Sequence, residues 1–124
     1  MSQLVTYNGL VGYVLEQRRI GLGFDQGHVA REAHMSQPVL SRLEKGKASI
    51  TVDQIFVLSR VLQTTPEEVI REAQECARKF EEAEAVQVTT SKQSDTIQKS
   101  DSKAGAVLAG AAIGAVLGVL LSRK

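Results

Sequence analysis

The sequence predicts an all-α fold: five short helices in a compact bundle, the fifth extended, then a flexible linker and a C-terminal hydrophobic helix. In the first part of the chain, segments with helical apolar spacing alternate with glycines and with residues that cap helices. A polar stretch and an uncharged apolar stretch follow. These changes divide the chain into a domain at 1–70, an amphipathic extension at 71–86, a linker at 87–103 and a hydrophobic helix at 104–122.

The composition excludes several classes of protein. The chain has 124 residues, of which 43% are hydrophobic and only 4% aromatic, and its formal net charge is +1. The single cysteine, Cys76, excludes an internal disulfide and a cysteine-rich zinc site. The sequence shows no nucleophile–base pair, no metal-ligand spacing and no phosphate-binding loop. We therefore expect no enzyme activity, no metal and no cofactor.

Each predicted helix after the first begins at a residue that can accept hydrogen bonds from the first helical turn. Pro38 and Pro66 lie at helix starts, where a missing N–H costs little. Gly21 and Gly23 are expected to end the first helix. The expected N-cap residues are Asp25, Ser36, Thr51 and Thr65. The expected helices span 8–20, 26–33, 37–45, 52–62 and 66–86.

Two short helices joined by a tight turn at 34–36 indicate a helix-turn-helix. The segment SQPVLSRLEKGK, residues 36–47, is its most diagnostic part. With Arg19, Gln26 and the apolar positions around it, this segment resembles the lambda-repressor/Cro-like, or XRE-type, helix-turn-helix family. The resemblance covers about residues 10–70 and implies a sequence-specific transcriptional regulator that binds double-stranded DNA.

The resemblance implies that the third helix lies in the major groove, with its N-terminal residues facing base edges. A glutamine there suits adenine, an arginine suits guanine, and an apolar side chain suits the thymine methyl group. The start of the second helix and the loop after the third would contact phosphates. The implied DNA-contacting residues are Gln26, Ser36, Gln37, Val39, Ser41, Arg42, Lys45 and Lys47.

Three further residues have structural roles under this resemblance. Arg19 and Glu44 occupy positions that form a partly buried ion pair in the family, so we do not count them as DNA contacts. His34 stands in the turn, where the family usually has glycine, and a positive φ is therefore expected there.

The helix that begins at Pro66 carries apolar residues at alternating spacings of four and three, a heptad seam. Such a seam favours a homodimer or a higher homo-oligomer. The alternative is one long helix whose first turns pack on the bundle while the remainder is solvated. The seam residues are Val69, Ala73, Cys76, Phe80 and Ala83.

Residues 104–121 carry no charge, and 18 helical residues nearly span a bilayer core. Small residues recur every four positions, which permits close helix packing in lipid. The pattern resembles glycine-zipper tails and the C-terminal anchors of small bacterial tail-anchored proteins. It predicts a cytoplasmic domain attached to the inner membrane; a soluble oligomeric assembly is the alternative. The small residues are Ala106, Gly110, Gly114 and Gly118.

The favoured function is a dimeric DNA-binding regulator, tethered to the membrane or oligomerised by its tail. Two alternatives remain open. RodZ-like morphogenetic proteins combine this fold with a membrane helix, and there the helix-turn-helix would bind a protein. The third possibility is a membrane-active, assembly-forming small protein controlled by its N-terminal domain.

Overall fold

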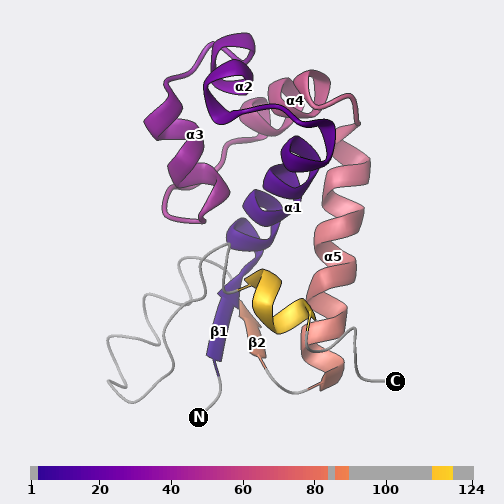
Figure 1. Cartoon of the computed structure of the whole chain (residues 1–124). Helices are drawn as coiled ribbons and strands as arrows, with labels where there is room; N and C mark the ends of the chain where they lie inside the picture. Colours follow the sequence, from indigo (N-terminus) through magenta and orange to yellow (C-terminus); the bar gives the residue numbers. More distant parts are fainter. Residues whose placement is uncertain (1–2, 84–85, 90–112, 119–124) are drawn as a thin grey trace.

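The computed structural model of the chain describes residues 3–83, 86–89 and 113–118. The structure is mostly helical, as predicted, and α1 runs through the middle of the domain (Figure 1). The elements are β1 (Gln3–Thr6), α1 (Tyr7–Leu22), α2 (Gln26–Glu32), α3 (Gln37–Glu44), α4 (Val52–Val61), α5 (Pro66–Ala83) and β2 (Val86–Thr89).

The helix starts follow the predicted caps. Thr51 forms a full capping box, because Gln54 also accepts a hydrogen bond from the Thr51 backbone N–H. One cap was not predicted: Thr6 accepts from the N–H of Gly9 at 2.8 Å and starts α1. Each predicted N-cap side chain accepts a hydrogen bond from the backbone N–H three residues further on, and these residues are Asp25, Ser36, Thr51 and Thr65.

The first helix ends later than predicted. Gly21 lies inside α1, so the expectation that it stops the helix is wrong. Gly23 is the C-cap, in the left-handed region at φ 75°, where glycine carries no Cβ penalty. Its N–H bonds to the Ile20 carbonyl, and the Phe24 N–H bonds to the Arg19 carbonyl, which satisfies the last turn.

A two-stranded parallel sheet corrects the all-α prediction. β1 and β2 pair in the register Gln3 to Val86 and Thr6 to Thr89. The predicted linker therefore starts too early, since residues 87–89 belong to β2, while 90–103 lie outside the described residues. The burial of Leu4 and Val5, at 2% and 0% exposure, supplies the physical reason: this short strand covers the base of the core.

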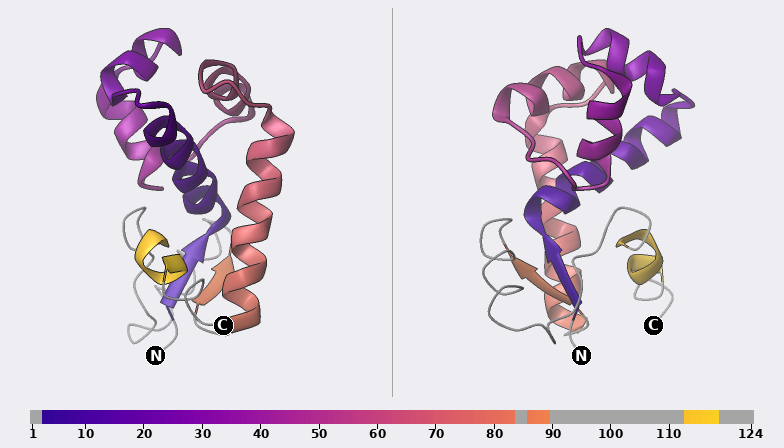
Figure 2. Two further views of the ribbon diagram at one scale, coloured as in Figure 1. Left: turned by 45° about the vertical axis from the view of Figure 1, so that its right-hand side comes forward. Right: turned by 90° about the vertical axis from the view of Figure 1, so that its left-hand side faces the viewer.

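Most of the described part of the apolar seam of α5 is buried inside the chain. α5 packs along α1 and against β2 (Figures 1 and 2). Val69, Ala73 and Phe80 are buried, so the seam that suggested a homodimer contacts the protein's own domain. The alternative, in which the first turns pack on the bundle and the remainder of the helix is solvated, is wrong, because Phe80 has no exposed surface. The helix ends at Ala83, short of the predicted 86.

The core is built almost entirely from aliphatic side chains of the helices. Leu10 and Leu15 of α1, Leu40 of α3 and Leu58 of α4 are fully buried or nearly so. Phe80 is the largest fully buried side chain among the described residues. The scarcity of aromatic residues therefore reflects helix–helix packing by branched aliphatic side chains.

A short helical segment at 113–118 represents the predicted hydrophobic tail in the structure. Ile113 and Leu117, at 0% and 5% exposure, join the core of the domain. Ala106 and Gly110 lie outside the described residues. In the described part of the chain, no helix is both long enough and apolar enough to cross a membrane.

Gly12 allows α1 and α3 to approach closely. A methyl group at this position would lie 2.1 Å from the Leu43 carbonyl oxygen and 3.1 Å from that of Glu44. Both contacts are with backbone, which cannot rotate away as a side chain can. The spacing of α1 and α3 thus depends on the missing side chain.

Gly12→Ala is expected to lower the free energy of unfolding by roughly 1–3 kcal/mol or more, because α3 must move away from α1. Urea unfolding followed by circular dichroism measures the change. The matched control is Gly21→Ala in the same helix, where nothing lies within 4 Å of the added methyl group. That control should be neutral or stabilise the protein by up to about 1 kcal/mol. Equal effects of the two substitutions would contradict the close-approach explanation.

Candidate nucleic-acid interface

The third helix, α3, lies at one side of the domain with its outer face open (Figure 1). Leu40 and Leu43 face the core, each 1% exposed. The opposite face carries the residues implied as base contacts. Ser36, Gln37 and Arg42 are exposed, and Val39 and Ser41 are half-buried. The structure therefore brings the predicted base-facing residues together on one helix.

A buried carboxylate anchors the inner end of this site. Glu44, the last residue of α3, is 1% exposed and accepts hydrogen bonds from Arg19 Nε and Nη2 at 2.7 and 3.1 Å. Arg19 also donates to the Phe24 carbonyl at 2.9 Å. Arg19 lies on α1, so the pair ties α1 to α3, and the predicted structural ion pair is present.

Two glutamines extend this network to the surface. Gln26 Nε2 donates to Glu44 Oε1 at 2.7 Å, and Gln26 Oε1 accepts from Gln37 Nε2 at 2.9 Å. Because the Gln26 nitrogen faces a carboxylate, its oxygen is left for Gln37. One N–H and the side-chain oxygen of Gln37 remain available, which is the donor and acceptor set that adenine requires.

The turn between α2 and α3 has the expected strained residue. His34 has φ 57°, in the left-handed region. The turn is closed by hydrogen bonds from the His34 N–H to the Arg31 carbonyl and from the Met35 N–H to the Ala30 carbonyl. These bonds hold a conformation that is uncommon for a residue other than glycine.

The loop after α3 is held by Asn8, a role that was not predicted from the sequence. Its Nδ2 donates to the Ala48 carbonyl and its Oδ1 accepts from the Ile50 N–H, both at 2.8 Å. Gly46, at φ 74°, lies against Gly9, where a methyl group would come within 2.9 Å of the Cα atom. Asn8 at the start of a helix was the available signal, but its partners lie about forty residues away.

The free positive charge near α3 comes from three side chains. Arg42, Lys45 and Lys47 are exposed and make no ion pair within the described ranges. By contrast, Arg71 and Arg78 of α5 are neutralised by glutamates of the same helix. An anion approaching the described surface therefore meets unpaired cations beside α3, whereas the two arginines of α5 are already compensated.

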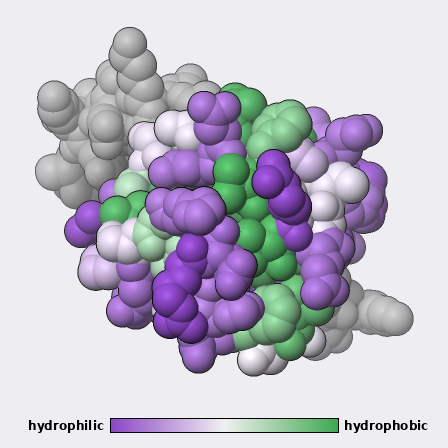
Figure 3. Space-filling view, turned by 90° about the horizontal axis from the view of Figure 1, so that it is seen from above, coloured by the Kyte–Doolittle hydropathy of each residue, from purple (hydrophilic) through white to green (hydrophobic). Residues whose placement is uncertain are grey.

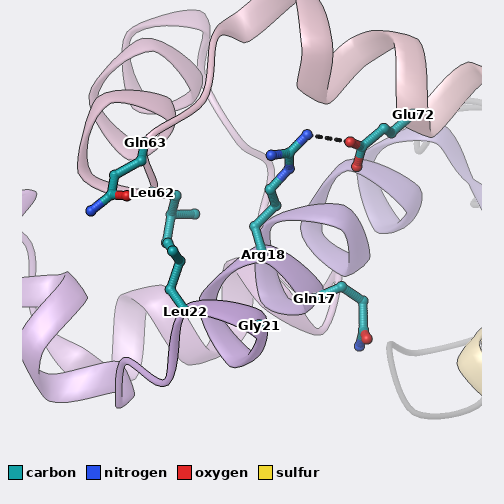
Figure 4. Close-up of a pocket in the computed structure, with 7 residues that line it drawn as sticks. All are labelled: Gln17, Arg18, Gly21, Leu22, Leu62, Gln63 and Glu72. Atoms are coloured by element: carbon teal, nitrogen blue, oxygen red, sulfur yellow. Dashed lines mark hydrogen bonds and ion pairs between the residues drawn. The ribbon is translucent and has the colours of Figure 1, made fainter.

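A hollow of about 390 Å³ lies between the end of α1, the α4–α5 turn and α5 (Figure 4). Arg18 points across it to Glu72, with which it forms a hydrogen-bonded ion pair (Figure 4). Leu22 and Leu62 form part of its wall. Because Glu72 already neutralises Arg18, this hollow is not an anion site. The Arg18–Glu72 ion pair instead joins α1 to α5.

A second hollow of about 510 Å³ lies between α2 and α4. Phe24 and His28 line it, and their rings are in contact at a tilt of 59° with a centroid distance of 4.8 Å. Seen from the end that holds α2 and α4, apolar side chains form a band between polar ones (Figure 3).

Within the described residues, no group of three potential metal ligands is found.

Comparison with known proteins finds a family match over this part of the chain. Residues 15–69 match a helix-turn-helix family model. This match covers the helices and turn that form the network around Glu44. Among curated proteins, none matches the chain.

Two solved structures share the helix-turn-helix fold. One structure of the clp gene regulator ClgR from C. glutamicum is 22% identical and covers 56% of this chain and 90% of its own, with a TM-score of 0.54. A second structure of ClgR from Corynebacterium glutamicum is 18% identical and covers 76% of this chain and 93% of its own, with a TM-score of 0.58. The shared fold extends beyond the helix-turn-helix segment itself.

Arg19→Met should destabilise the protein by about 3–5 kcal/mol, because it leaves the buried Glu44 carboxylate without its cation. Chemical unfolding at pH 7 measures the loss. Arg71→Met is the matched control, since Arg71 pairs with Glu68 at the surface, where their side chains are 64% and 38% exposed. That exposed pair should contribute much less, because water screens the attraction between the two charges. A loss for Arg19→Met as small as that of the control would contradict the buried-anchor role.

Glu16→Gln should stabilise the protein at pH 7 but not below about pH 4. Burial raises the pKa of the Glu16 carboxyl and the Glu44 carboxylate raises it further, against smaller effects of Arg19 and Lys45. A carboxyl whose folded-state pKa is raised contributes stability at low pH that is lost as the pH rises through that pKa. Thermal melting of both proteins from pH 3.5 to 7 checks this. A pH-independent difference would disprove it.

Proposed function

We propose that this protein is a sequence-specific DNA-binding transcriptional regulator. The observation that carries the proposal is the hydrogen-bonded chain from buried Glu44 through Gln26 to exposed Gln37. It fixes a side chain with one free donor and one free acceptor at the N-terminal end of an exposed helix. The helix-turn-helix match supports the same conclusion, and both similar structures carry the description of a gene regulator.

The proposed readout divides into base contacts and phosphate contacts. Gln37 would bind adenine with its remaining N–H and its oxygen, and exposed Arg42 would bind guanine. Half-buried Val39 offers a methyl contact to thymine. Lys45 and Lys47 would neutralise phosphates, because they are exposed and unpaired in a loop that Asn8 and Gly46 hold in place.

Dimerisation remains part of the proposal, since dimers of this class bind two half-sites. Its interface cannot be the α5 seam, because Val69 and Phe80 are already buried against the domain. The apolar surface left exposed on α1 and α4 includes Ile20, Leu22 and Phe56, at 54%, 37% and 56% exposure.

Membrane attachment through residues 104–121 is the second part of the proposal. Its support is the uncharged run itself, flanked by Lys103 before it and by Arg123 and Lys124 after it. A domain that reads DNA must work where DNA is, so we place the domain in the cytoplasm. A tethered regulator would then search only DNA close to the membrane.

The DNA proposal is tested by selecting a preferred duplex from random sequences with the full chain, then measuring affinity by fluorescence anisotropy. Arg42→Ala should lose roughly 1–3 kcal/mol on the selected duplex and relax its sequence preference. Lys45→Ala should weaken binding to all duplexes alike and reduce the salt slope by about one.

Arg78→Ala on α5 is the matched control, since it also removes one positive charge but lies on the helix with compensated charges. It should leave affinity and salt dependence almost unchanged. If the full chain selects no duplex and binds none at low salt, the regulator proposal is wrong. A protein-binding role of the helix-turn-helix would then be favoured.

A further inference from the structure

Residues 113–118 of the apolar tail pack against the domain. We call the surface that they cover, which includes Tyr13, the seat. In the short helix 113–118, Ile113 and Leu117 lie one turn apart on the same face and are buried. The helix lies near the end of the molecule that holds β1 and β2 (Figure 1). Ala115 and Gly118 are exposed on its other side. The contact is therefore one-sided, with one face against the domain and one face toward solvent.

Tyr13 of α1 forms a wall of this seat. A methyl group added at Gly114 would lie 3.3 Å from Cε1 and 3.5 Å from the hydroxyl oxygen of Tyr13. A methyl group added at Gly118 would meet nothing within 4 Å. The two glycines belong to the same small-residue series, yet only one of these two touches the domain.

The buried residues of this helix belong to a stretch that also suits lipid. Residues 104–121 carry no charge, so each apolar side chain of the stretch is stabilised wherever it leaves water. Ile113 and Leu117 cannot be buried against the domain and in a bilayer at the same time. The seat and the bilayer therefore compete for the same apolar side chains of the tail.

We propose that the tail exchanges between its seat beside Tyr13 and a lipid bilayer, and that docking holds the protein off the membrane. This inference rests on the membrane attachment proposed above. The seat lies at the opposite end of the domain from the tip where α2 lies, and the outer face of α3 is not part of it (Figures 1 and 2). DNA binding and tail docking are thus compatible, and the tail decides where the DNA reader works.

The test compares two substitutions in the full chain by co-sedimentation with vesicles of phosphatidylethanolamine and phosphatidylglycerol. Gly114→Trp places a large side chain against Tyr13, whereas Gly118→Trp places the same side chain in open space. Both add equal hydrophobicity for lipid. We expect Gly114→Trp to bind vesicles several-fold more than Gly118→Trp, because only the first disturbs docking. The chain has no native tryptophan, so the fluorescence of each variant also reports insertion.

Tyr13→Ala provides a second variant in which the tail is unchanged. It removes the wall of the seat from α1 and should also raise vesicle binding above that of the wild type. Thermal melting confirms that each variant is folded. If Gly114→Trp fails to fold, the comparison of Tyr13→Ala with wild type decides the inference.

The outcomes separate the inference from the proposed function. Equal vesicle binding by Gly114→Trp and Gly118→Trp, together with equal binding by Tyr13→Ala and the wild type, would overturn the seat but retain membrane attachment. No vesicle binding by any of them would overturn both. Release of the tail into larger oligomers without vesicle binding, seen by gel filtration of Gly114→Trp, would show that a second copy of the chain takes the tail and would overturn the choice of lipid.

Discussion

The buried carboxylate of Glu44 is the constraint on which the rest of the domain depends. A charge that is 1% exposed must be compensated, and Arg19 and Gln26 supply three hydrogen bonds to it from two other helices. These bonds set the separations of α1, α2 and α3 together. They work only because Gly12 lets α1 approach the carbonyl groups at the end of α3. The position of the exposed Gln37 thus depends on hydrogen bonds that lead back to the buried Glu44.

The same constraint helps to separate the unpaired cations beside α3 from the paired charges of α5. The one carboxylate of α3, Glu44, cannot pair with the cations beside this helix, because it is turned inward and bonded to Arg19. Most of the acidic side chains of the long helix α5 are exposed or half-buried there and pair with arginines of the same helix or with Arg18. In the described part of the chain Arg42, Lys45 and Lys47 are therefore left unpaired beside α3, although the whole chain is nearly neutral.

Features that depend on neighbouring residues could be predicted from the sequence, and features that depend on distant ones could not. The caps, the positive φ of His34 and the Arg19–Glu44 pair follow from local patterns or from the family resemblance. Periodicity identified the apolar seam of α5 but carried no information about its partner, which is α1 rather than a second chain. β1 and β2 are four residues each, and no local pattern relates two strands from opposite ends of the domain.

The parallel pairing of β1 and β2 also has a consequence for biosynthesis. The strand Gln3–Thr6 finds its partner only when Val86–Thr89 has left the ribosome, after α1 to α5 have been made. Contacts of such long sequence separation form slowly, while ribosomes add about 5–20 residues per second. The apolar stretch at 104–121 therefore emerges within seconds of the strand that completes the domain. In a nascent chain, the strand that completes the sheet and the apolar stretch thus become available for folding at nearly the same time.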